Sequence, residues 1–222
     1  MKKQSVIGLI VSLLLSCISF ASLANEAALY DLAPQGSAFI RIVNLREQSP
    51  NQSTPNKLRL KFHRKGLSAE GYCSASKFIY VAPGEYRQKT NGMLWEGTLE
   101  ANQAYSLVVA NNSLKLLEDY RAEDSRRGVF AVYNFSGRSD LGLNTALSAR
   151  PVFAGIPQGQ SVARAINPLK SAFVVVDSTA GESESLAVTD PIIFQAGVLS
   201  SLFICAEQSR IVARWVDSMV GR

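Results

Sequence analysis

The sequence predicts an all-β protein in which two tandem small β-sandwich domains, immunoglobulin-like or jelly-roll-like, follow a cleaved signal peptide. Short apolar and β-branched runs recur at intervals of about ten to twenty residues, separated by Gly, Pro, Asn and Ser. Almost no stretch shows helical periodicity, and two pairs of these runs resemble each other at nearly equal spacing. The first 24 residues have a different composition, typical of an export signal.

The N-terminus has the three-part layout of a secretory signal peptide. Two lysines precede an apolar run over residues 6–15, and the small-residue site Ser22-Leu23-Ala24 follows. The run is too short to anchor the chain across a bilayer. A Leu-Leu-Ser-Cys string loosely resembles a lipoprotein box, so lipidation at Cys17 is the alternative. We favour cleavage before Asn25, which places a free mature chain outside the cytoplasm.

In the mature chain the β-rich runs divide into two groups. The first group is expected at residues 38–43, 58–62, 78–81, 105–110 and 114–117. The second group is expected at residues 129–133, 141–147, 172–176, 186–188, 199–205 and 210–216. Within the run at 58–62, apolar residues alternate with Arg59 and Lys61, which is the pattern of a half-buried strand. Such short strands joined by turns favour sandwiches over a parallel α/β sheet.

An internal repeat supports the division into two domains. Residues 38–45 resemble residues 128–135, and both are apolar strands that reach an Asn, a residue suited to a turn. Residues 100–109 resemble residues 195–204, so the two offsets are 90 and 95 and the order is kept. We therefore expect a signal peptide at 1–24, a first domain at 25–118, a linker at 119–127 and a second domain at 128–222.

Net charge narrows the class of partner. The chain has a formal net charge of +5, and removing the two lysines of the signal peptide leaves +3. An exported protein rarely meets nucleic acid, so we expect no nucleic-acid partner. An acidic polysaccharide or an acidic protein is the natural match for a mild positive excess.

Two cysteines, Cys73 and Cys205, belong to the mature chain. An oxidising compartment permits a disulfide between them. Cys205 lies in the apolar run at 202–206, where it also fits as a small buried hydrophobe. The sequence leaves both interpretations open, and a bond would join the two predicted domains.

The sequence offers no convincing catalytic set. His63 is the single histidine, and the alternation of its strand places it on the outer face. Ser-His-Asp or Cys-His catalysis would have to use it, and a histidine-based metal site would lack a second histidine. Asp119, Glu123 and Asp124 are interpreted as solvated linker acids. We therefore expect no enzyme activity, no catalytic residue, no metal site and no cofactor.

Two aromatic residues are candidates for stacking on sugar rings. Trp95 lies on a short segment near turns, and Tyr86 follows the Pro83-Gly84 turn. The alternative is that both rings pack a sandwich core. The basic pair Arg126-Arg127 is open to a similar choice between a solvated turn and a binding surface.

Several strings in the mature chain occur together in one known family. They are Ala28-Leu29-Tyr30, residues 33–44 (Ala-Pro-Gln-Gly-Ser-Ala-Phe-Ile-Arg-Ile-Val-Asn), Val81–Tyr86, the strand reaching Asn134, and Ile166-Asn167-Pro168. In this order they resemble the alginate O-acetylation accessory proteins, the AlgF family, over most of the mature chain. The segments 46–56 and 69–77 depart from the pattern of that family.

The resemblance implies a non-catalytic periplasmic adaptor that docks with the enzymes that acetylate alginate. The implied partners are periplasmic and membrane-associated alginate O-acetyltransferases, with direct contact to the anionic polymer as an addition. Candidate contact surfaces are the strand of Arg41, the Pro83-Gly84 hairpin and a groove between the domains. The residues selected on these surfaces are Arg41, Tyr86, Trp95, Arg126, Arg127 and Arg164.

Two other non-catalytic functions remain as alternatives. One is a free-standing polysaccharide-binding β-sandwich module. The other is a periplasmic pilus-type chaperone, which would need a long alternating edge strand late in its first domain. Residues 105–117 are broken by Asn111-Asn112-Ser113, which disfavours the chaperone. An acetyltransferase in its own right would depend on His63 or Cys73.

Overall fold

Strands are the only regular elements in the parts of the chain that the computed structural model describes. These parts are residues 33–47, 56–62, 64–90, 92–121, 124–178 and 184–219. They hold nineteen strands, which confirms the predicted all-β class. Within them no helix is long and apolar enough to cross a membrane. The predicted signal peptide, Cys17 and His63 lie outside the described residues.

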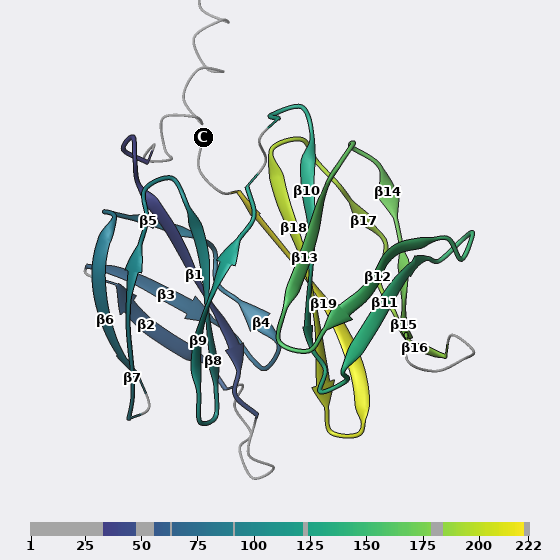
Figure 1. The fold of residues 1–222 in the computed structure, drawn as a ribbon, viewed down its shortest axis with the longest axis horizontal. Helices are drawn as coiled ribbons and strands as arrows, with labels where there is room; N and C mark the ends of the chain where they lie inside the picture. Colours follow the sequence, from purple (N-terminus) through teal and green to yellow (C-terminus); the bar gives the residue numbers. More distant parts are fainter. Residues whose placement is uncertain are drawn as a thin grey trace, which may run out of the picture. The chain divides into compact units, whose positions relative to one another are not determined.

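The first half of the fold is built on one mixed sheet. Its strands are β1 (Ala38–Leu45), β2 (Leu58–Phe62), β3 (Lys65–Ala69), β4 (Ser74–Ala75), β5 (Ile79–Val81), β6 (Gly84–Thr90), β7 (Met93–Leu99), β8 (Ala104–Ala110) and β9 (Leu114–Asp119). The sheet has the order β4-β1-β8-β9, and β5 also pairs with β1. Apolar side chains of the hairpins β2-β3 and β6-β7 belong to the same core cluster as those of β1 and β8. Figure 1 shows the two hairpins beside this sheet.

The second half contains two four-stranded sheets that face each other across a second core. Its strands are β10 (Gly128–Phe135), β11 (Asp140–Thr145), β12 (Pro151–Pro157), β13 (Ser161–Ile166), β14 (Lys170–Ser171), β15 (Phe173–Asp177), β16 (Ser185–Val188), β17 (Ile192–Ile193), β18 (Val198–Glu207) and β19 (Arg210–Met219). The sheet orders are β13-β10-β18-β19 and β12-β11-β15-β16. Phe130, Phe173 and Phe194 lie at the centre of the core between them, with ring centroids 4.9–6.0 Å apart.

The internal repeat corresponds to two parallel strand pairs at the centres of the two halves. In the first half β1 and β8 pair with Phe39 opposite Ala104, and in the second half β10 and β18 pair with Val129 opposite Leu199. These registers are related by the offsets of 90 and 95 residues found in the sequence. All four strands have two buried faces, which explains their nearly continuous apolar runs.

Each repeat carries a buried asparagine in the same place. Asn44 and Asn134 lie within their strands and are fully buried, whereas the sequence suggested that they mark turns. Their side-chain nitrogens each donate to two backbone carbonyls at 2.7–3.1 Å: Asn56 and Gly71 for Asn44, Arg138 and Ile156 for Asn134. The two amides therefore fasten the ends of β1 and β10 to neighbouring loops and to β12, because buried polar groups must find partners.

A third apolar cluster joins the two halves. It combines Val43 and Val108 of the first half with Ala131, Tyr133 and Phe203 of the second. The β1-β8 and β10-β18 pairs therefore contribute one face to their own core and the other to this shared cluster. Residues Pro34–Arg222 accordingly form one compact unit. The tandem arrangement is consistent with this structure, and the domain and linker boundaries stay predictions.

A disulfide crosses the shared cluster. Cys73 and Cys205 are bonded, with their Cα atoms 6.1 Å apart and a separation of 132 positions in the sequence. Both residues are fully buried. The choice that the sequence left open is therefore resolved in favour of a bond, and Cys205 is buried as well as bonded.

We predict that removing this bond destabilises the fold without abolishing it. The double substitution Cys73→Ala/Cys205→Ala should lower the free energy of unfolding by about 2–5 kcal/mol, because the unfolded chain regains the freedom of a long loop. Guanidinium denaturation of the mature chain measures the loss. Dithiothreitol should shift the wild-type midpoint and leave the double variant unchanged; an unshifted wild type with two titratable thiols would contradict the assignment.

Candidate functional site

Arg41 is the residue around which the junction of the two halves is organised. Along β1, Ile40 and Ile42 point into the first core, so the alternation of the strand sends Arg41 to the opposite face. That face is covered by the second half, and the Arg41 side chain is fully buried. Its guanidinium carbon lies 4.6 Å from the ring centroid of Phe78 and 5.2 Å from that of Phe203. Aromatic faces stabilise a buried cation.

The charge of Arg41 is matched by Asp119 at the end of β9. Arg41 Nη2 lies 2.8 Å from Asp119 Oδ2, and both side chains are fully buried. Arg41 Nε donates to Ser106 Oγ at 2.7 Å, and Ser106 Oγ donates to Asp119 Oδ2 at 2.5 Å. Arg41 Nη2 also donates to the Tyr133 hydroxyl at 2.9 Å, and this hydroxyl donates to Asp119 Oδ1. We call these four residues the buried charge network.

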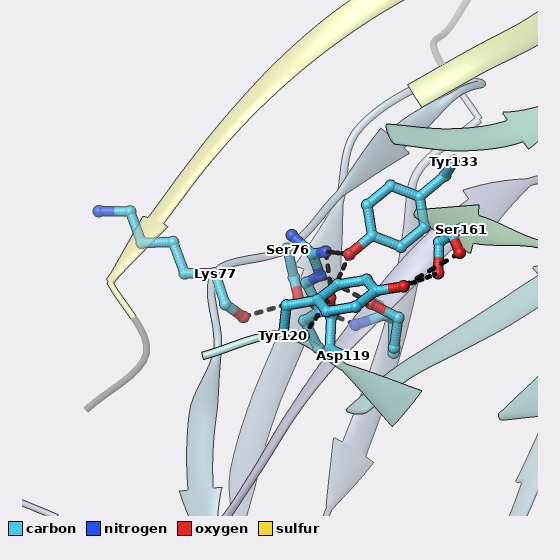
Figure 2. Close-up of polar contacts among 9 residues, drawn as sticks. Ser76, Lys77, Asp119, Tyr120, Tyr133 and Ser161 are labelled. Atoms are coloured by element: carbon cyan, nitrogen blue, oxygen red, sulfur yellow. Dashed lines mark hydrogen bonds and ion pairs between the residues drawn. The ribbon is translucent and has the colours of Figure 1, made fainter. Parts of the chain in front are cut away.

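The network crosses from one half to the other. Arg41, Ser106 and Asp119 belong to three strands of the first half, and Tyr133 belongs to β10 of the second. Figure 2 shows the Tyr133 ring with its hydroxyl directed at Asp119. Tyr120 extends the crossing, since its backbone N–H donates to Asp119 at 3.1 Å and its hydroxyl donates to the Ser161 carbonyl of β13 at 3.0 Å (Figure 2).

Burial determines the ionisation of the tyrosine in this network. Burial raises the pKa of the Tyr133 hydroxyl well above its usual range; the Arg41 cation opposes the shift, and the Asp119 carboxylate adds to it. Tyr133 is therefore a neutral donor to the carboxylate. All four side chains are enclosed, so the network binds the two halves together and presents no atom to a ligand.

Two sequence-based interpretations are corrected by the network. Arg41 was placed on a contact surface, but it is buried because β1 lies between neighbours on both edges and a second layer on its outer face. Asp119 was interpreted as a solvated linker acid, but it ends β9 and neutralises Arg41. The sequence did contain a signal for this pair: Arg41 is a lone charged residue inside an apolar strand, and a buried charge requires a partner.

The two aromatic candidates pack against the first core. Tyr86 on β6 and Trp95 on β7 are half-buried, and their ring centroids lie 5.7 and 6.4 Å from that of Phe62. The Tyr86 hydroxyl donates to the Ala82 carbonyl at 2.6 Å. The structure thus shows the core-packing alternative for both rings, and a contact role for their exposed parts stays a prediction.

The three remaining candidate arginines are exposed. Arg164 lies in the second half, and Arg126 and Arg127 lie in the segment just before β10. Arg127 donates to the Ala165 carbonyl at 2.8 Å, next to Arg164 on β13, so these two lie close together. Arg164 in turn donates to the Val152 carbonyl at 3.1 Å. Arg126 is paired locally with Asp124 at 3.1 Å. Their role in partner binding stays a prediction.

Groups suited to metal binding do not gather in the described part of the chain. There, no three His, Cys, Asp or Glu side chains lie close enough to hold an ion. The cysteines are bonded to each other, so neither offers a thiolate.

The fold and the junction define a class: an all-β protein of two sandwich-like halves joined by a buried charge network and a disulfide. The family described as alginate O-acetyl transferase AlgF matches residues 12–197, and the chain belongs to this family. The family resemblance seen in the sequence is thereby confirmed.

Relatives of similar length support this assignment. The chain is 28% identical over 202 residues to the alginate biosynthesis protein AlgF of Azotobacter vinelandii, covering 89% of this chain and 86% of the relative. It is 26% identical over 211 residues to AlgF of Pseudomonas fluorescens, covering 93% and 90%. A solved C-terminal domain of AlgF from P. aeruginosa is 22% identical, with a TM-score of 0.36, and covers 41% of this chain and 98% of that domain.

We predict that removing one charge of the Arg41–Asp119 pair destabilises the fold more than replacing both charged side chains with apolar ones. Asp119→Ala should lower the free energy of unfolding by about 3–5 kcal/mol, because Arg41 is left as an uncompensated buried charge. The double variant Arg41→Met/Asp119→Ala should lose clearly less than the sum of the losses in the single variants Arg41→Met and Asp119→Ala. Chemical denaturation of the four proteins completes the cycle; additive losses would contradict a direct pair.

Alkaline titration should reveal the raised pKa of Tyr133. Above pH about 10 the unfolded chain loses this proton and the folded chain keeps it, so stability should fall as pH rises through that range. Tyr133→Phe should lack this part of the decline. Denaturation midpoints at pH 8–11 for both proteins test the difference, and parallel curves would contradict it.

Proposed function

We propose that the protein is a non-catalytic periplasmic adaptor required for the O-acetylation of alginate, docking with the acetyltransferases that modify the polymer. One observation carries the proposal: in this chain of the AlgF family, the chemically reactive side chains named above have structural roles. The cysteines form a disulfide, and the acid, hydroxyl and guanidinium groups of the buried charge network are enclosed.

Ser106 illustrates why the network supports scaffolding better than catalysis. A nucleophilic serine needs a base that accepts its proton and a path for the substrate. Ser106 does donate to Asp119, but it also accepts from Arg41 and is fully buried. The family description names an acetyl transferase; we infer that this chain serves the transfer while separate enzymes perform its chemistry.

A rigid two-part body suits an adaptor. The disulfide, the shared apolar cluster and the buried charge network fix one half on the other, so surfaces on both keep a constant geometry. Two partners held on such a body meet at a high effective concentration without new contacts between them. The export signal and the disulfide both favour an oxidising compartment, which supports the periplasm as the location.

We expect deletion of the gene in its host to remove acetyl groups from alginate while the polymer is still made. The wild-type gene should restore acetylation, since the adaptor reunites enzyme and substrate. Ester content of the purified polymer, measured by proton NMR, gives the result. Unchanged acetylation after deletion would refute the proposal.

His63→Ala provides the test of the non-catalytic part. Because His63 is the single histidine, an enzyme built on a histidine base would fail without it. We expect the His63→Ala gene to restore acetylation as fully as the wild type. Loss of acetylation at a normal protein level, together with acetyl transfer by the purified wild-type chain, would instead make the protein an enzyme.

A further inference from the structure

The outer face of the β2-β3 hairpin carries two exposed cations, Arg59 and Lys61. Along β2 the apolar residues face the core, and Arg59 and Lys61 are exposed on the other side. Their cross-strand neighbours on β3 are Ser68 and Gly66, which are too small to cover them. Within the described residues neither cation has an ion-pair partner, in contrast to Lys57, which is paired with Glu70.

A cleft of about 510 Å³ opens at the end of this hairpin. Its lining is mainly apolar and includes Phe62, Val81, Pro34 and Pro83, with Tyr80 at one side. Arg64 also lines it, so the positive row continues to its mouth. We call Arg59, Lys61, Arg64 and this cleft the basic groove.

We infer that the basic groove is a docking surface for an acidic segment of a protein partner that carries an exposed apolar side chain. The row of cations matches carboxylates, and the cleft at its end matches an apolar anchor, which is where interface energy concentrates. This inference rests on the proposed function, because it makes an acetyltransferase the bearer of that segment.

The lining of the cleft argues for a protein over the polyuronate itself. A sugar chain needs hydrogen-bond partners for its hydroxyls, and polar groups left unpaired on burial weaken binding. The Ser37 hydroxyl in the cleft already donates to the Pro34 carbonyl at 2.7 Å. The Lys65 ammonium lies 2.9 Å from the centroid of the Tyr80 ring, so that ring face is covered. An apolar side chain requires none of these groups.

Exposed cations on a strand also discourage edge pairing between chains, and this is the simpler explanation for Arg59 and Lys61. That explanation does not require an apolar cleft in line with the cations. The two explanations differ in what a charge reversal does to a partner, so binding measurements separate them.

Three variants of the mature chain test the inference. Arg59→Glu/Lys61→Glu reverses the row, and Ala82→Trp narrows the cleft from an exposed position without touching the core. Arg150→Glu/Lys170→Glu is the matched control, since it makes the same charge change at exposed sites of the second half. Circular dichroism and denaturation midpoints must match those of the wild type before binding is compared.

Biolayer interferometry against each purified periplasmic alginate acetyltransferase of the host is the measurement. We expect the row variant and the cleft variant each to bind the partner at least about tenfold more weakly, and the control to bind as the wild type does. Wild-type affinity should also fall when NaCl is raised from about 0.15 M to about 0.5 M.

The outcomes separate this inference from the proposed function. If the wild type binds a transferase and the row variant binds equally well, the basic groove is refuted and the adaptor stands. If the wild type binds none of them and deletion leaves acetylation intact, the adaptor itself is refuted. Calorimetric titration with polymannuronate is the third arm: binding that is lost in the row variant would assign the groove to the polymer and overturn a protein partner.

Discussion

The buried charge network, in which Tyr133 of the second half bonds the Arg41–Asp119 pair of the first, is the constraint on which the arrangement of the two halves depends. A guanidinium withdrawn from water is costly unless a carboxylate and further hydrogen bonds meet it. The carboxylate comes from β9 of the same half, and the Tyr133 hydroxyl that bonds both Arg41 and Asp119 comes from β10, so the pair gains this partner only when both halves are in place. An alternative docking of the halves would keep Asp119 beside Arg41, but it would take the Tyr133 hydroxyl away from both side chains and the Phe203 ring away from the guanidinium. The pair therefore favours one relative placement.

Because of the internal repeat, the two halves contribute equivalent strand pairs to the junction. In each half a parallel strand pair supplies one face to its own core and the other to the shared cluster. The faces are not equivalent, however, because the position that holds Arg41 in β1 corresponds to Ala131 in β10. One repeat thus carries a large charged side chain where the other carries a small apolar one.

The local pattern of apolar residues was enough to predict the strands that lie in the cores. It was not enough to predict the β6-β7 hairpin, the burial of Arg41 or the basic groove. β1, β8, β10 and β18 are doubly buried and nearly continuous in apolar residues, so they are evident in the sequence. The hairpin β6-β7 was missed because its outer face is polar and its inner face is only half-buried. The burial of Arg41 depended on Asp119, which is distant in the sequence and lies near other acids that resemble a linker. The basic groove combines β2 with residues 34–37 and 80–83, which only the tertiary fold brings together.

The position of the disulfide has a consequence for how the chain is matured. Cys73 and Cys205 lie inside the shared cluster, so no external thiol reaches either sulfur once the halves have closed. Oxidation must therefore occur while the junction is still open, and reduction would first require the junction to separate. The finished protein is insulated from changes in the thiol balance of its surroundings. The folded protein consequently has a single covalent form.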